Sequence, residues 1–137
     1  MDKKIIVSAC LAGINCNYAG KSNTDPGIVN LVKQGKAILV CPEQLGGLPT
    51  PRIPAEIKDG KVVNKAGEDV TRQFYRGAHE ALKIAKMVNS KEAILKSRSP
   101  SCGVGKIYDG TFSGTLTDGD GIFAALLKEN GIEVRNI

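Results

Sequence analysis

The chain has 137 residues, the usual size of a single domain that can bury its own hydrophobic core. Hydrophobic residues make up 42% and charged residues 24%, and no apolar run approaches the roughly 18 residues needed to cross a membrane, so a membrane span is excluded. The net charge of +5 suits an anionic ligand, but the basic residues are spread along the chain and not interleaved with its aromatic residues, which leaves nucleic-acid binding unsupported.

The first ten residues resemble the start of a lipoprotein signal, because Lys3 and Lys4 precede an apolar run that ends at Cys10. That run is only residues 5–9, whereas a signal peptide needs an apolar region of about 7–15 residues. We therefore expect a cytoplasmic protein. Thiols stay reduced in that compartment, so the four cysteines are not expected to form disulfides.

Short β-branched apolar runs predict buried strands, and amphipathic patterns between them predict helices. Strands are expected at residues 3–9, 36–41, 92–97 and 132–137, and helices at 25–33, 68–89 and 121–130, the last one starting behind Asp118 or Asp120. The Asp-Gly pairs at 59–60 and 109–110 predict two tight β-hairpins. This alternation predicts an α/β fold in one domain, residues 1–137: a three-layer doubly wound, mainly parallel sheet of about four core strands with inserted β-hairpins.

Three of the four cysteines lie at or just past the ends of predicted strands. Cys10 and Cys41 end the first two strands, and Cys102 follows the third. The carboxyl ends of parallel strands form the ligand-binding edge of such sheets, so we expect these thiols to converge. Free cysteines are often plain core residues, but turn-forming residues follow each of these three, which a core position does not need. Cys16 has no strand before it and is expected to be an ordinary loop thiol.

The residues around the thiols exclude two common loop chemistries. A phosphatase-type cysteine needs an arginine six positions later, and those positions hold Cys16, Gly47 and Tyr108. A phosphate-binding GxxxxGK[ST] loop at GVGK would need a glycine at 100 and a hydroxyl residue at 107, which are Pro100 and Ile107. A zinc site with all four thiolates and an iron–sulfur cluster both remain open.

Three long segments resemble, in the same order, motifs of the TudS-type thiouracil desulfidases, a family long known only as a domain of unknown function. They are SACLAGINCNYAG, CPEQLGGLPTPRIPAE and LKSRSPSCGVGKIYDGTFSGTLTDGDG, and together they span almost the whole chain. The resemblance implies a 4Fe-4S cluster with three cysteine ligands, Cys10, Cys41 and Cys102, and one open iron. It also implies hydrolytic, non-redox chemistry with Glu43 and Ser99 as the catalytic, proton-handling residues.

Each of these two assignments has a structural alternative. Glu43 could be a helix-starting or solvated carboxylate, and Ser99 could be a turn serine that bonds its own backbone. Substrate contacts are expected within the motifs, at Tyr18, Gly47, Arg52 and Ser101. Family members commonly have Arg-Tyr-Asp-Gly where this chain has Asn17, Tyr18, Ala19 and Gly20, a departure that bears on the substrate more than on the cluster.

The sequence thus predicts an iron–sulfur-dependent desulfidase that removes sulfur from a small thiolated base or nucleotide. The expected partner besides this substrate is the iron–sulfur assembly machinery. The alternative is a non-catalytic zinc- or iron–sulfur-binding module in sulfur trafficking or thiol sensing.

Overall fold

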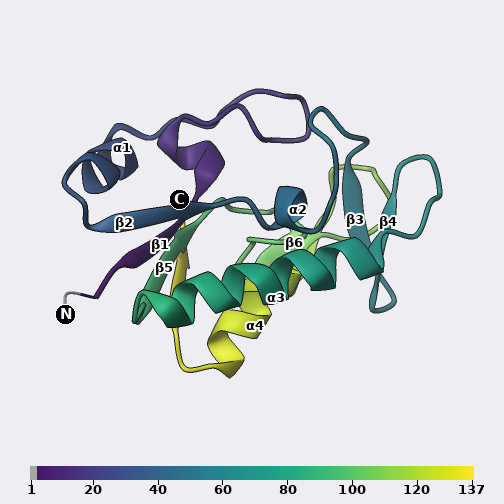
Figure 1. Cartoon of the computed structure of the whole chain (residues 1–137). Coiled ribbons are helices and arrows are strands. Elements are labelled where there is room, and N and C mark those ends of the chain that lie inside the picture. The colour runs from purple at the N-terminus through teal and green to yellow at the C-terminus, as the bar shows by residue number, and fades with distance from the viewer. Residues whose placement is uncertain (1–2) are drawn as a thin grey trace.

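The computed structural model describes residues 3–137 and is built around a four-stranded parallel sheet (Figure 1). The strands are β1 (Ile5–Ser8), β2 (Ala37–Val40), β5 (Glu92–Leu95) and β8 (Glu133–Asn136), in the order β2-β1-β5-β8. All three neighbouring pairs are parallel. The predicted strands and the α/β fold are therefore confirmed.

Helices cover both faces of this sheet, which gives the expected three layers. On one face α1 (Pro26–Lys33) and the short 3₁₀ helix η1 (Ala9–Ala12) pack on Val7 and Ile94. On the other face α3 (Thr71–Met87) and α4 (Ile122–Glu129) pack on Ile6, Ala93 and Leu95. Successive strand residues face opposite layers, so each strand supplies both cores. No helix in the described part of the chain has the length and apolar character that a membrane crossing requires.

The connections at the carboxyl ends of β1 and β2 are short helices that the sequence did not predict. The 3₁₀ helix η1 follows β1 directly, and α2 (Pro42–Leu45) follows β2 with Cys41 as its N-cap residue. Because β2 and β5 flank β1 on opposite sides, the strand order reverses here. Such a switch point is where open α/β sheets bind their ligands.

Both predicted hairpins are present as antiparallel strand pairs, but only the first has the tight Asp-Gly turn that the sequence predicts. Strands β3 (Ala55–Lys58) and β4 (Lys61–Asn64) are joined by Asp59 and Gly60, both with positive φ, as a type I′ turn requires. Strands β6 (Lys106–Tyr108) and β7 (Leu116–Asp118) are instead joined by the seven-residue loop 109–115. There the Asp109 carboxylate accepts hydrogen bonds from the backbone and hydroxyl of Thr111, which opens a wider loop.

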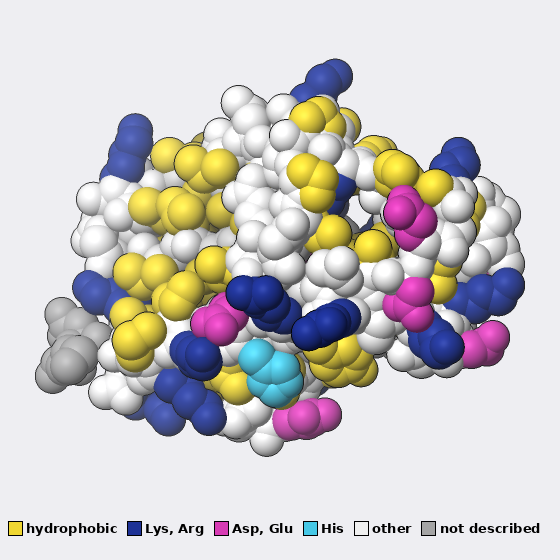
Figure 2. All heavy atoms as spheres, turned by 45° about the vertical axis from the view of Figure 1, so that its right-hand side comes forward, with side chains coloured by type: hydrophobic (Ala, Val, Ile, Leu, Met, Phe, Trp, Pro, Cys, Tyr) yellow, Lys and Arg dark blue, Asp and Glu magenta, His cyan; other side chains and the backbone are white. Residues whose placement is uncertain are grey.

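Two helix starts differ from the prediction because the acidic residues have other partners. Helix α3 begins at Thr71, whose backbone nitrogen donates a hydrogen bond to the Asp69 carboxylate. Helix α4 has Gly121 as its N-cap residue, not Asp118 or Asp120. Asp120 accepts a hydrogen bond from the Gly105 backbone and pairs with Lys128. The exposed His79 lies on the outer face of α3, and Figure 2 shows the histidine with both basic and acidic side chains around it.

We expect Gly77→Ala to destabilise the protein, because α2 and α3 touch through backbone. A Cβ on Gly77 would lie 1.8 Å from the Pro42 carbonyl oxygen, and one on Gly46 would lie 2.0 Å from that of Gln73. Overpacking of this kind costs about 1–3 kcal/mol in the free energy of unfolding. Urea denaturation measures it, with the exposed His79→Ala on the same helix as the control. Equal midpoints for Gly77→Ala and wild type would contradict the tight packing.

Candidate functional site

A cavity of about 1000 Å³ opens at the switch point of the sheet. Its walls come from η1, the loop that contains residues 16–19, α2, the segment 47–56 and the turn 96–102. Figure 2 shows the surface hollowed on the side of the molecule that carries β3 and β4. Segments far apart in the sequence therefore meet around one space at the carboxyl ends of the strands, as predicted.

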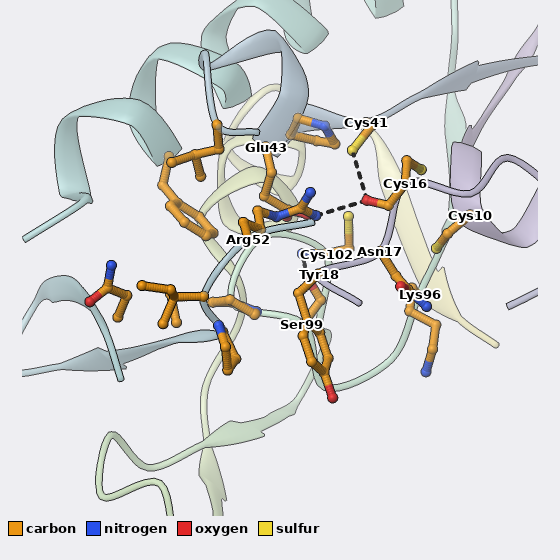
Figure 3. A pocket seen from close by; sticks show the side chains of 18 of the residues that line it. Cys10, Cys16, Asn17, Tyr18, Cys41, Glu43, Arg52, Lys96, Ser99 and Cys102 are labelled. Carbon is orange, nitrogen blue, oxygen red and sulfur yellow. Dashed lines mark hydrogen bonds and ion pairs between the residues drawn. The ribbon is translucent and has the colours of Figure 1, made fainter. Parts of the chain in front are cut away.

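All four thiols line this cavity, although only three were expected there. The structure brings together Cys10, Cys41 and Cys102, from the ends of β1, β2 and the turn after β5 (Figure 3). Cys16, predicted to be an ordinary loop thiol, is 2% exposed and lies beside Cys41. The loop brings Cys16 back to the end of β1, because the backbone nitrogens of Ile14 and Asn23 donate hydrogen bonds to the carbonyl oxygens of Ala9 and Cys10, respectively. Because Cys16 does not follow a strand end, its position at the cavity could not be predicted from the sequence.

Burial and crowding keep most of these thiols protonated. Burial raises the pKa of the Cys10 thiol to about 11, with Glu43 and Cys41 adding to the effect, and burial also raises the pKa of Cys102. Cys16 and Cys41 lie side by side, with the Cys41 thiol 3.9 Å from the Cys16 carbonyl oxygen, to which it donates; the neighbouring Cys16 thiol lowers the pKa of Cys41, and Cys41 in turn raises the pKa of Cys16. Cys41 is therefore the first of the four to become a thiolate.

Glu43 lies beside the thiols and is held by a buried arginine. Arg52 Nη2 donates to Glu43 Oε2 at 2.7 Å and to the Cys16 carbonyl oxygen at 2.9 Å (Figure 3). The second guanidinium nitrogen, Nη1, donates to Thr50 Oγ1 at 3.1 Å. The Arg52 and Glu43 side chains are only 8% and 14% exposed. Burial raises the pKa of Glu43, and Arg52 opposes that rise.

One carboxylate oxygen of Glu43 remains unused. Within residues 3–137, Oε1 is buried without a hydrogen-bond partner, and so is the hydroxyl oxygen of Ser101. The Ser101 hydroxyl lies close enough to favour the ionised form of Glu43, yet the two groups do not reach normal hydrogen-bond geometry. Buried polar atoms without partners are rare in native proteins and commonly mark a bound water, an ion or a catalytic role.

Ser99 builds the turn that presents Cys102. Its Oγ accepts hydrogen bonds from the backbone nitrogens of Ser101 and Cys102, both at 3.0 Å. This is the turn-serine arrangement, and the hydroxyl hydrogen is not used by either bond. Ser99 also lines the cavity, whereas Ser101 is 1% exposed and does not. The catalytic role of Ser99 and the substrate role of Ser101 stay predictions.

The other expected substrate contacts border the cavity. Tyr18 is 55% exposed at its rim, and Gly47, with φ of +92°, lies in the loop after α2. The Arg52 guanidinium also borders the cavity but is engaged by Glu43 and Cys16. Asn17, where the family commonly has arginine, accepts hydrogen bonds from the backbones of Ala19 and Lys21, so it holds its own turn.

Lys96 is a cavity residue that the sequence argument missed. It directly follows β5 and lies near Cys10, whose pKa its charge lowers against the larger effect of burial (Figure 3). The strand-end rule that selected the cysteines could have found it. A lysine beside several thiolates would offset part of their negative charge.

The donor set, four thiols around one cavity, is of the kind that holds an iron–sulfur cluster. Across residues 3–137, no three or more His, Cys, Asp or Glu side chains lie together closely enough to hold one ion. A four-iron cluster is a larger body, and thiolates placed around a cavity are its usual ligands. Cys10, Cys41 and Cys102 could hold such a cluster, with Cys16 as a further thiol on the same cavity.

Comparison with known proteins identifies the chain's relatives. Residues 5–136 match the 2-thiouracil desulfurase family. The uncharacterized protein YbbK of Bacillus subtilis strain 168 is 48% identical over 140 residues, covering 95% of this chain and 93% of that protein. A solved structure of the [4Fe-4S]-dependent thiouracil desulfidase TudS superimposes with a TM-score of 0.93 at 45% identity, covering 98% of this chain and 91% of that one.

These matches confirm the family resemblance of the three sequence motifs, and the structural similarity confirms the α/β fold. The match covers nearly the whole chain, including the segments that carry the four thiols and Glu43. The chain therefore belongs to the 2-thiouracil desulfurase family.

Proposed function

We propose that this protein is a [4Fe-4S]-dependent desulfidase that replaces the sulfur of a thiolated pyrimidine with oxygen from water. The observation that carries the proposal is the meeting of Cys10, Cys41 and Cys102 around one cavity, with Glu43 buried beside them. Membership of the 2-thiouracil desulfurase family and the likeness to the TudS structure support it.

In this proposal the three thiolates hold the cluster and the rest of the site handles water. When bound, the cluster supplies an open iron, a Lewis acid that makes a thiocarbonyl sulfur a better leaving group. Arg52 fixes Glu43 through Oε2, which leaves Oε1 free to accept a proton from an attacking water. The new carbon–oxygen bond replaces the carbon–sulfur bond, and sulfur leaves as sulfide with no net oxidation or reduction.

The unpartnered Oε1 of Glu43 also favours an enzyme over a non-catalytic sulfur-trafficking or thiol-sensing module. A module that only stores a metal needs no buried carboxylate oxygen that lacks a partner, since such an atom is costly to bury. Loading of the cluster would require the iron–sulfur assembly machinery of the cell. The four free cysteines agree with a reducing compartment, the cytoplasm, for the protein.

We expect Glu43→Gln to lose activity while the cluster stays bound. Loss of a general base typically costs about 10²–10⁴-fold in rate. Sulfide release from 2-thiouracil by anaerobically reconstituted protein measures the rate, and iron and acid-labile sulfide per chain report the cluster. The matched control is Glu80→Gln, which changes a carboxylate paired with Lys83 on α3. A fully active Glu43→Gln would remove Glu43 from the mechanism.

Single Cys→Ser variants should separate the three proposed ligands from Cys16. We expect Cys10→Ser, Cys41→Ser and Cys102→Ser each to lose most of the approximately four irons that a loaded chain carries. Cys16→Ser should retain its iron, because three thiolates suffice. Iron analysis after anaerobic reconstitution decides the matter, and loss of iron in Cys16→Ser alone would contradict the proposed ligand set.

Thiol alkylation of cluster-free protein should follow the order of the pKa shifts. Only the thiolate reacts, so Cys41, with its lowered pKa, should be modified first near pH 8. Since the pKa of Cys10 is raised to about 11, its rate should grow about tenfold for each pH unit between pH 7 and 10. Peptide mass spectrometry after iodoacetamide pulses measures both rates. Cys10 reacting as fast as Cys41 at pH 8 would contradict this assignment.

A further inference from the structure

Glu56 is a second buried acidic residue of the CPEQLGGLPTPRIPAE motif, and it accepts hydrogen bonds from the loop 109–115. It lies on β3 and is 9% exposed. Its Oε1 accepts hydrogen bonds from the backbone nitrogens of Gly110 at 3.0 Å and Phe112 at 3.1 Å. A carboxylate that accepts hydrogen bonds from two backbone amides is held firmly against that backbone, so Glu56 joins β3 to the loop 109–115.

The loop 109–115 fits closely against β3 at the point that Glu56 holds. A Cβ on Gly110, whose φ is +92°, would lie 2.6 Å from Lys58 Cβ and 2.8 Å from the Ile57 carbonyl oxygen. Only glycine therefore lets the loop come this near. In Figure 1, β3 lies close to β6, from which the loop continues.

The same loop carries an aromatic side chain to the cavity. Phe112 lines the cavity that holds the four thiols, together with Tyr108 and Gly114. Its φ of +56° is in the left-handed region, which a bulky residue rarely occupies unless its surroundings enforce it. The amide that Glu56 binds is that of Phe112 itself, so this hydrogen bond acts directly on the unusual backbone conformation.

We propose that Glu56 is a positioning residue that fixes Phe112 as an aromatic wall of the substrate site, against which a thiolated base rests. This inference rests on the proposed function. The positioning role rests on the two hydrogen bonds that Glu56 Oε1 accepts, both from the backbone of the loop 109–115. A pyrimidine ring has two flat faces, and an aromatic side chain binds such a face by stacking.

Steady-state kinetics of cluster-loaded variants test the wall. Glu56→Ala removes both hydrogen bonds and Phe112→Ala removes the ring. Both should raise KM for 2-thiouracil about tenfold, the usual effect of losing one stacking partner, with kcat nearly unchanged. Glu56→Gln keeps an amide oxygen that can accept both bonds and should restore KM to near the wild-type value. Glu133→Ala, an exposed carboxylate at the start of β8, is the matched control.

Hydrogen exchange on cluster-free protein tests the positioning separately from activity. Exchange of the peptide that spans 109–115 should accelerate in Glu56→Ala but not in Glu56→Gln or Glu133→Ala. If Glu56→Ala does not fold, Glu56→Asp replaces it, since its shorter side chain cannot reach both amides from β3. Unchanged exchange would overturn the positioning role.

The outcomes also separate this inference from the proposed function. The aromatic wall would be overturned, with desulfidation unaffected, by either of two results. One is faster exchange of 109–115 in Glu56→Ala with an unchanged KM, and the other is a wild-type KM in Phe112→Ala. If loaded wild-type protein releases no sulfide from 2-thiouracil, the proposed function fails and the substrate wall falls with it. The exchange experiment then still decides whether Glu56 holds the loop.

Discussion

The buried ion pair between Arg52 and Glu43 is the interaction on which the arrangement of the site depends. The Arg52 guanidinium joins three segments by hydrogen bonds. It binds α2 through Glu43, the loop after β1 through the Cys16 carbonyl oxygen, and the segment that contains Arg52 itself through Thr50. Both side chains are largely excluded from water, so removing one partner would leave the other as an uncompensated buried charge, which typically costs about 3–5 kcal/mol. The pair is therefore a structural constraint as well as part of the chemistry.

The same pair explains the charge balance of the cavity. The Glu43 carboxylate lies among the four thiols and its charge acts to raise the pKa of each, whereas the charges of Arg52 and Lys96 act in the opposite direction within this group. Burial and, after it, the charge of Glu43 raise the pKa of Cys10 and Cys102, so without a bound cation these thiols keep their protons. A cluster that binds thiolates must displace those protons. Loading of the site is therefore linked to proton release and is favoured as the pH rises.

Much of this arrangement could be predicted from sequence because it follows from strand ends. Cys10, Cys41 and Cys102 come together because the carboxyl ends of parallel strands lie at one edge of a sheet. This rule can be applied from the sequence alone, once the strands are recognised. Cys16 could not be placed in this way, because long-range backbone hydrogen bonds of its loop return it to the cavity. The start of α4 escaped prediction for a related reason, because Asp120 accepts a hydrogen bond from the distant Gly105 backbone. The loop 109–115 escaped it for a local reason, since Asp109 bonds to Thr111 two residues later in place of forming a tight Asp-Gly turn.

Glu43 and Glu56 show why a motif alone does not separate chemistry from positioning. Both are carboxylates of one motif, and both are largely buried next to the same cavity. Glu56 gives one oxygen to two backbone amides, so its position is fixed and its charge is shared with the chain. Glu43 gives one oxygen to Arg52 and keeps the other without a partner. The unused oxygen of Glu43 is buried beside the thiols, where it can take a proton, whereas the hydrogen bonds that Glu56 accepts come from the backbone of the loop 109–115, so the surroundings of each carboxylate indicate its role.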